Sequence, residues 1–186
     1  MGSHVLAISG SLRAASINSA FCRAASRLAP PPLRVSVFSS LGTLPLFNPD
    51  LETAPPPAVL KFRAAVESAD ALLIASPEYA HGVSGVLKNA LDWLVSFEGF
   101  IAKPVVLVNT SPRAHHAYDG LREILQTMSA DILPEASMAL PLLGGCVTEE
   151  AMVSSPEIAR TIRDALASLA RALRPGPEPG PSFPID

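Results

Sequence analysis

The sequence predicts an α/β protein with three layers, in which helices cover both faces of a five-stranded parallel sheet. Short apolar runs alternate five times with segments of helical period, and runs such as Val5–Ser9 and Ala71–Ala75 have the composition of strands buried on both faces. The 186 residues suffice for one domain with a sizeable core. This alternation is typical of a parallel sheet between helical layers.

Each element follows from its local pattern. The predicted strands are Val5–Ser9, Leu33–Ser39, Ala71–Ala75, Pro104–Asn109 and a strand within the irregular stretch Ile132–Leu142. The predicted helices are Asn18–Ala29, Ala58–Ser68, Val83–Phe97, Tyr118–Ala130 and Ser154–Leu173. Ser154 and Glu157 at the start of the last helix resemble a capping box.

Five strands favour the flavodoxin-like strand order 2-1-3-4-5, in which ligands bind beyond the carboxyl ends of the strands where strand 1 lies beside strand 3. Three polar segments follow strands 1, 3 and 4 and are expected to meet at that rim: Gly10–Asn18, Ser76–Gly85 and Thr110–His116. Residues 1–174 are expected to form this single domain. The Pro- and Gly-rich residues 175–186 are expected to be a disordered tail.

Composition excludes several classes of function. A net charge of −3 gives no basic footprint, so nucleic acid is not expected as a partner. No apolar run reaches transmembrane length and the N-terminus lacks a signal-peptide pattern, so we expect a cytoplasmic protein without a membrane partner. Cys22 and Cys146 are interpreted as two reduced thiols, with a disulfide as the open alternative.

The first rim segment has the features of a phosphate site. It lacks the Lys of a Walker A loop, and it lacks both the GxGxxG pattern and the acidic residue after strand 2 that a dinucleotide fold needs. A phosphate monoester fits better, because a helix start supplies unpaired N–H groups and hydroxyl and guanidinium groups add donors. The candidate donors are Ser11, Arg13, Ser16, Asn18 and Ser19. The alternative is a helix cap beside a surface arginine.

The second rim segment, SPEYAHGVSG, suits a flat ring. Pro77 stiffens the turn, Tyr79 offers an aromatic face, and Gly82 lets backbone approach a ligand closely. An ordinary loop with a half-buried tyrosine is the alternative. Ser84 resembles a hydrolase nucleophile only weakly, because Val86 replaces the second glycine of G-x-S-x-G.

The remaining chemical side chains predict neither a metal site nor a catalytic acid–base pair. His115 and His116 are adjacent residues with no third ligand in view, so a metal is not expected there. These histidines and His81 are expected at the rim, where they can contact a ligand. Glu78 is interpreted as a solvated carboxylate rather than a proton donor.

The third helix bears on assembly. Its apolar residues fall within an arc of about 160°, from the step of ~100° per residue, which is wider than the stripe of many surface helices. The excess fits a two-fold interface with a second subunit. A helix well buried in its own domain is the equal alternative.

Together, GSLRAASIN and PEYAHGVSGVLKNALDW closely resemble the NADPH-dependent FMN reductase family, which is flavodoxin-like and includes quinone, chromate and azo-dye reductases. The resemblance implies FMN phosphate on Ser11, Arg13, Ser16, Asn18 and Ser19. It implies the isoalloxazine ring over Pro77, Glu78, Tyr79, His81 and Gly82. It also implies a homodimer or homotetramer, with the third helix at the interface.

The chain departs from the family after strand 4. Members commonly carry a Ser-Gly-Gly turn there, whereas this chain has Ser111-Pro112-Arg113. Pro112 removes an N–H donor and a flexible φ. Ser111 is retained as an expected flavin contact, and Arg113 with the histidines is a candidate for the phosphates of the nicotinamide cofactor or for restricting access to the ring.

The leading hypothesis is therefore an oxidoreductase that passes electrons from NADPH or NADH through bound FMN to a quinone, free flavin, azo compound or metal oxyanion. The cofactor carries that chemistry, so no catalytic side chain is required. The alternatives are a flavin-binding electron carrier with little NAD(P)H turnover and a phosphate-binding hydrolase.

Overall fold

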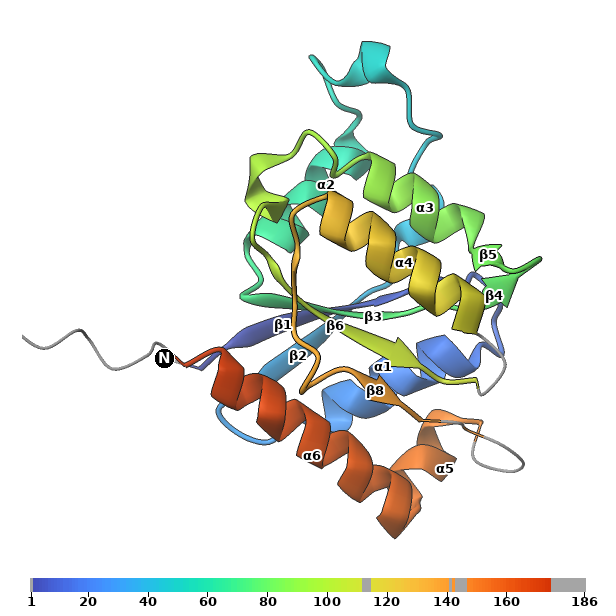
Figure 1. Cartoon of the computed structure of the whole chain (residues 1–186), viewed down its shortest axis with the longest axis vertical. Helices are drawn as coiled ribbons and strands as arrows, with labels where there is room; N and C mark the ends of the chain where they lie inside the picture. Colours follow the sequence, from blue (N-terminus) through green and yellow to red (C-terminus); the bar gives the residue numbers. More distant parts are fainter. Residues whose placement is uncertain (1, 112–114, 141, 143–146, 175–186) are drawn as a thin grey trace, which may run out of the picture.

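The computed structural model describes residues 2–111, 115–140, 142 and 147–174. Within them, a parallel sheet lies between two helical layers (Figure 1). Its strands are β1 (His4–Ser9), β2 (Arg34–Phe38), β3 (Ala71–Ala75), β6 (Pro104–Asn109), β7 (Asp131–Ile132) and β8 (Met138–Ala139). The order β2-β1-β3-β6-β7, with β8 also on β6, confirms the predicted order 2-1-3-4-5.

The predicted fifth strand is split into two short pieces on the same edge of β6. Both β7 and β8 pair with β6 in parallel. Between them the chain leaves the ladder, and the Leu107 N–H donates instead to the Ser137 hydroxyl at 3.1 Å. The irregular sequence of this stretch therefore corresponds to a real interruption of the strand.

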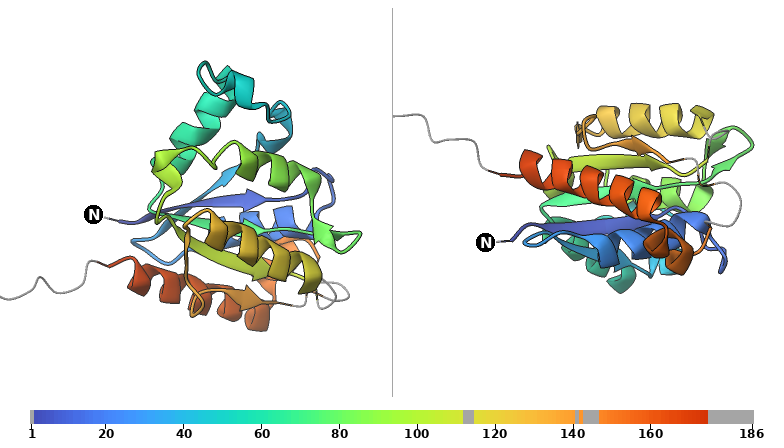
Figure 2. Two further views of the ribbon diagram at one scale, coloured as in Figure 1. Left: turned by 45° about the horizontal axis from the view of Figure 1, so that its top comes forward. Right: turned by 90° about the horizontal axis from the view of Figure 1, so that it is seen from below.

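Helices cover both faces of the sheet, as Figures 1 and 2 show. They are α1 (Ile17–Leu28), α2 (Pro57–Glu67), α3 (Gly85–Asp92), α4 (His115–Thr127), α5 (Glu149–Ser154) and α6 (Pro156–Ala172), with short 3₁₀ turns η1 (Leu41–Thr43), η2 (Pro49–Leu51) and η3 (Glu98–Phe100). Alternate strand residues face different layers: Val5 and Ala7 pack with α1, α5 and α6, whereas Leu6 and Ile8 pack with α2, α3 and α4. Burial on both faces explains the wholly apolar strands.

The predicted third helix, Val83–Phe97, is wrong at both ends. Val83 belongs to a hairpin strand, so α3 begins at Gly85. Beyond Asp92 the backbone turns tighter, with Leu94 N–H donating to Leu91 O and Phe97 N–H donating to Leu94 O.

The wide apolar arc of this helix is covered largely from within the same chain. The indole N–H of Trp93 donates to Pro45 O at 2.9 Å, and Phe47 packs edge-on against that indole. Asn89 holds the same loop, since its side chain accepts from Phe47 N–H and donates to Pro45 O. The arc therefore gives no support to an interface on α3.

The predicted last helix, Ser154–Leu173, is two helices. Pro156 lacks the N–H that a continuous helix needs, and the helix is interrupted at Ser155, just before it. Ser155, not Ser154, caps α6 by accepting from Ile158 N–H. None of the helices within the described residues is both long and apolar enough to cross a membrane. The tail 175–186 lies outside those residues.

Candidate functional site

The loops after β1, β3 and β6 meet at one rim of the sheet, as the strand order predicts. Ser9 pairs with Ala75, and Ala75 pairs with Val108, so the carboxyl ends of the three strands are level. Gly10 joins the first two ends, because its N–H donates to Ala75 O at 2.8 Å. A Cβ on Gly10 would lie 2.6 Å from Ser76 Oγ. A larger residue at this position would force the side chain of Ser76 to move.

Ser84 ties the second rim loop to the first. Its buried hydroxyl donates to Gly10 O at 2.6 Å and caps α3 by accepting from Leu87 N–H. Both roles are structural, and they use the hydroxyl that a hydrolase would need as its nucleophile. The structure therefore weakens the hydrolase alternative further.

Three of the predicted phosphate-binding serines come together around the start of α1. Ser16 caps the helix by accepting from Ser19 N–H at 3.2 Å. The Ser19 hydroxyl lies 2.8 Å from that of Ser9 and 3.5 Å from Ser11 O. The first turn of α1 contains no acidic residue. This arrangement gives an anion both hydroxyl donors and the positive end of a helix dipole.

Arg13 and Asn18 lie differently. Arg13 is exposed, and its backbone N–H donates to Ser11 Oγ. Asn18 is buried, and its Oδ1 accepts from the Thr110 hydroxyl at 2.8 Å, which ties the start of α1 to the end of β6. The structure thus gives Asn18 a framing contact, while phosphate binding by either residue stays a prediction.

A cavity of about 360 Å³ lies beside these serines. It is lined by Ser9, Ser11, Leu12, Arg13, Ala14, Ser19, Arg23, Val37, Phe38, Ser39 and Leu41. No acidic side chain lines it, and two arginines do. The donor set therefore fits a phosphate group. Ser9 and Arg23 are residues that sequence reasoning missed, since neither belongs to the GSLRAASIN loop pattern or stands out locally.

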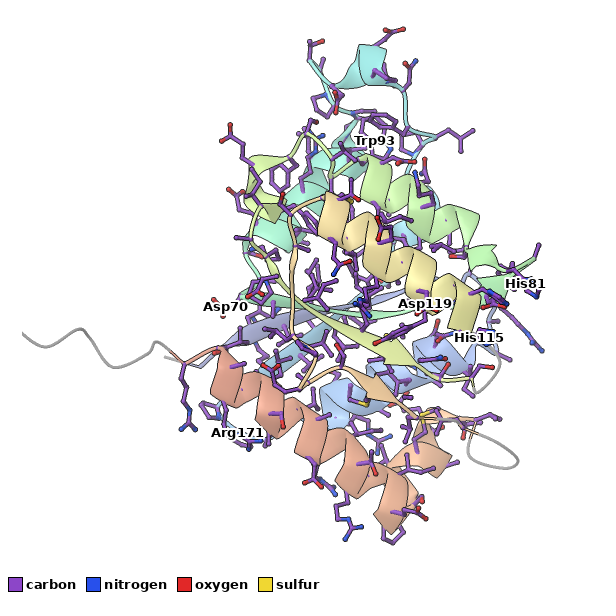
Figure 3. The ribbon with its side chains drawn as sticks, in the orientation of Figure 1. Asp70, His81, Trp93, His115, Asp119 and Arg171 are labelled. Carbon is purple, nitrogen blue, oxygen red and sulfur yellow. The ribbon has the colours of Figure 1, made fainter. Side chains whose placement is uncertain are left out.

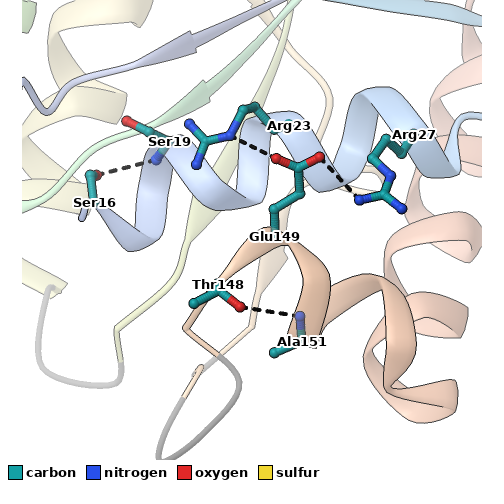
Figure 4. Close-up of polar contacts among 7 residues, drawn as sticks. All are labelled: Ser16, Ser19, Arg23, Arg27, Thr148, Glu149 and Ala151. Carbon is teal, nitrogen blue, oxygen red and sulfur yellow. Dashed lines mark hydrogen bonds and ion pairs between the residues drawn. The ribbon is translucent and has the colours of Figure 1, made fainter. Parts of the chain in front are cut away.

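Arg23 also takes part in an ion-pair contact that joins α1 to α5. Glu149, at the start of α5, accepts from Arg23 at 2.8 Å and from Arg27 at 3.3 Å, as Figure 4 shows. The hydrogen bond from Arg23 holds the pKa of Glu149 below its ordinary value. The bridge spans more than a hundred residues of sequence, and no local signal indicates it.

On the other side of the rim, the second loop forms a hairpin that the sequence did not predict. Strands β4 (Glu78–Tyr79) and β5 (Gly82–Val83) pair antiparallel, and Ala80 and His81 between them have φ of 49° and 59°. This rim hairpin (residues 78–83) leaves Tyr79 58% exposed. A Cβ on Gly82 would meet only Tyr79 O at 3.6 Å, so packing within the chain leaves room there for a ligand.

The predicted solvated carboxylate of Glu78 has a partner. It accepts from Ala117 N–H in the first turn of α4 at 2.8 Å. Negative charge is favourable at a helix start, so this contact fastens the hairpin to α4. Pro77 precedes the hairpin and bounds the same loop.

The three rim histidines gather where the hairpin meets α4, and Figure 3 shows His81 and His115 at that end of the molecule. The rings of His81 and His116 are stacked at 4.3 Å, and those of His115 and His116 lie 4.2 Å apart. Among the described residues no group of His, Cys, Asp or Glu side chains is placed to hold a metal ion.

The third rim loop is only partly described. Ser111 N–H donates to Asn109 Oδ1 at 3.0 Å. Pro112 and Arg113, where the chain departs from the family motif, lie outside the described residues. The expected flavin contact of Ser111 stays a prediction.

Comparison with known proteins decides the family. The family model for NADPH-dependent FMN reductases matches residues 3–142, which include all three rim loops. The chain belongs to this family. The match confirms the family that the two sequence motifs indicate.

Individual relatives agree. An NAD(P)H-dependent FMN reductase of Pseudomonas aeruginosa is 43% identical over 110 residues, which cover 58% of this chain and 59% of that protein. A quinone reductase of Pseudomonas putida is 36% identical over 148 residues, which cover 77% of this chain and 79% of that enzyme.

Solved structures support the fold. The flavoenzyme NAD(P)H:(acceptor) oxidoreductase FerB of Paracoccus denitrificans has a TM-score of 0.79 at 23% identity. The superposition covers 92% of this chain and 97% of the FerB chain. An NADH:FMN oxidoreductase (EMOB) in its apo form has a TM-score of 0.63 at 20% identity. The superposition covers 94% of this chain and 92% of the EMOB chain. At these identities the likeness concerns the fold.

Proposed function

We propose that the protein is an FMN-dependent oxidoreductase that takes electrons from NADPH or NADH and delivers them to a small-molecule acceptor. One observation carries the proposal: the hydroxyl-lined start of α1 lies on the same rim as the exposed face of Tyr79. A phosphate site and a flat-ring site on one rim fit the two ends of FMN.

The chain's residues divide the work of holding FMN. Ser11, Arg13, Ser16 and Ser19 supply hydroxyl, guanidinium and helix-start donors to its phosphate. Pro77, Tyr79 and Gly82 would border the ring, and Ser111 of the third loop is the further expected flavin contact. Asn18, Glu78 and Ser84 hold the three loops in position through their hydrogen bonds.

When bound, FMN would supply the redox chemistry between the nicotinamide and the acceptor. The protein's part is to orient the ring and leave one face open. The exposure of Tyr79 and the room beside Gly82 serve that purpose. The same open face admits a quinone, free flavin, azo compound or metal oxyanion, and relatives are named as quinone reductases.

Assembly and location complete the proposal. We propose a homodimer or homotetramer, as the family resemblance implies, and a location in the cytoplasm. Because the apolar arc of α3 is largely covered by residues 45–47, its interface role rests on the resemblance alone. Light scattering of the purified protein measures the number of subunits directly.

The test is a spectrum followed by a rate. Purified protein, supplied with FMN if needed, should show a bound-flavin spectrum in the visible range and oxidise NAD(P)H in the presence of a quinone. In anaerobic stopped flow, NADPH should reduce the protein-bound flavin faster than it reduces free FMN. Protein that takes up no FMN would contradict the proposal, and reduction no faster than that of free FMN would indicate an electron carrier.

A further inference from the structure

The imidazole cluster (His81, His115 and His116) is held by a strained turn. A two-residue hairpin turn with positive φ at both positions favours glycine or asparagine, yet here the positions are Ala80 and His81. Strain of this kind is found preferentially at functional sites. In this turn it brings the His81 ring onto His116 of α4.

Among the described residues, the rings of the cluster have only each other as partners. Within the described part of the chain, the imidazole nitrogens of these three residues form no hydrogen bond, and no ion pair joins them to a carboxylate. Their contacts with each other are ring to ring. Because each ring gives one face to a neighbouring ring and no described residue bonds the ring nitrogens, the nitrogen-bearing edges are what the cluster offers a ligand.

The surroundings favour an anion over a cation or a flat ring. Three histidines approach each other without a compensating acid, and the first turn of α4 contains none. The nearest carboxylate of the hairpin, Glu78, accepts from Ala117 N–H, and Asp119 lies one turn further along α4. Tyr79 is the other titratable group of the hairpin. A helix of 13 residues adds the positive end of its dipole at the same place.

We propose that the imidazole cluster is the subsite for the 2′-phosphate of NADPH. The inference rests on the proposed function, since the reductant must reach the flavin ring site that the same hairpin borders. A phosphate monoester carries a charge of about −1.5 to −2 near neutral pH, and imidazole edges supply N–H donors to it. The pyrophosphate is common to NADH and NADPH, whereas the 2′-phosphate is unique to NADPH.

The test compares two reductants and one non-redox probe. His116→Gln, and the double variant His115→Gln with His116→Gln, remove imidazoles while keeping polar side chains. His81→Asn removes the third ring while keeping a residue that tolerates positive φ. The ratio of kcat/KM for NADPH to that for NADH should fall about tenfold, the effect of losing one charge-assisted hydrogen bond.

Binding of 2′,5′-ADP and 5′-AMP to the flavin-free protein gives a readout that does not depend on activity. The two probes differ only in the 2′-phosphate. The wild-type protein should bind 2′,5′-ADP at least about tenfold more tightly, as one charge-assisted contact allows, and the cluster variants should lose that preference. His4→Gln, at the far end of β1, is the matched control and should retain it.

The outcomes separate the two proposals. If the wild-type protein oxidises neither reductant, the proposed function fails, while the probe measurement still tests the subsite. If it oxidises both and the variants leave the ratio and the probe preference unchanged, the subsite is refuted. Equal losses with NADPH and NADH would also refute it, because they would assign the cluster to the pyrophosphate.

Discussion

The two sides of the ligand rim are built differently. The start of α1 is part of the packed core, because Ser9, Ser16 and Asn18 are buried and each is hydrogen-bonded: Ser9 to Ser19, Ser16 to the Ser19 N–H, and Asn18 to Thr110. The rim hairpin projects instead, with an exposed Tyr79 and two non-glycine residues at positive φ. A phosphate is a fixed, compact group that a rigid site suits, whereas two different molecules must reach the face of the ring. The difference therefore matches the tasks proposed for the two sides.

The largest expected effect of substitution separates two glycines, one on each side. Gly10→Ala should lower the free energy of unfolding by about 2–3 kcal/mol, because the new Cβ would meet Ser76 Oγ at 2.6 Å in a packed site. Gly82→Ala is the control and should change stability by less than about 0.5 kcal/mol, since its Cβ meets only Tyr79 O at 3.6 Å. Urea denaturation of both variants measures this. Equal losses would contradict the contrast between core and hairpin.

An intermediate effect is expected at the hydrogen bond that joins Glu78 of the rim hairpin to α4. Glu78→Ala should cost about 1–2 kcal/mol, because it leaves Ala117 N–H without its charged acceptor at a helix start. Hydrogen exchange should accelerate in residues 78–83 and at the start of α4, and not around α1. Glu123→Ala, on the exposed face of the same helix, is the control. Unchanged exchange in the hairpin would show that Glu78 does not hold it.

The smallest effect is expected at the ion pairs that join Glu149 of α5 to Arg23 and Arg27 of α1. Glu149→Gln should cost no more than about 1 kcal/mol, because the guanidinium groups of Arg23 and Arg27 are about half exposed. The folded-state pKa of Glu149 is lowered from its ordinary value of 4.5, so the carboxylate's contribution is complete above that pH and is lost as the pH falls through the lowered pKa.

The measurement is the unfolding free energy of wild type and variant between pH 3 and pH 7. Their difference should vanish at the acid end. The control is Glu150→Gln, the exposed neighbour in the same turn. A difference that grows on acidification would contradict the role given to the bridge.

Several features of the fold and of the site could be predicted from the sequence. The strand order follows from buried apolar runs, and the gathering of Ser11, Ser16 and Ser19 follows from a loop placed before a helix. The structure also shows Cys22 as a buried thiol, and burial raises the pKa of that thiol to about 12.

Features that depend on contacts between distant segments could not be predicted from the sequence. The helix α3 ends at Asp92, where residues 45–47 cover the ring of Trp93, and Val83 pairs with Glu78 instead of joining the helix. The contacts of Asn18 with Thr110 and of Glu149 with Arg23 join segments that nothing in the local sequence connects. The hairpin's positive φ at Ala80 and His81 runs against residue preference, so propensity alone could not indicate it.

The central claim is that the start of α1 binds the phosphate of FMN, and one comparison tests it most directly. The dissociation constants of FMN and riboflavin, which differ only by that phosphate, are measured for the wild type, Arg13→Ala and Arg34→Ala. The wild type should prefer FMN by a factor of about 10 to 100 or more, and Arg13→Ala should lose about tenfold or more of that preference. Arg34→Ala, at the opposite end of the sheet, should retain it. Equal affinity of the wild type for both ligands, or a full preference retained by Arg13→Ala, would contradict the account.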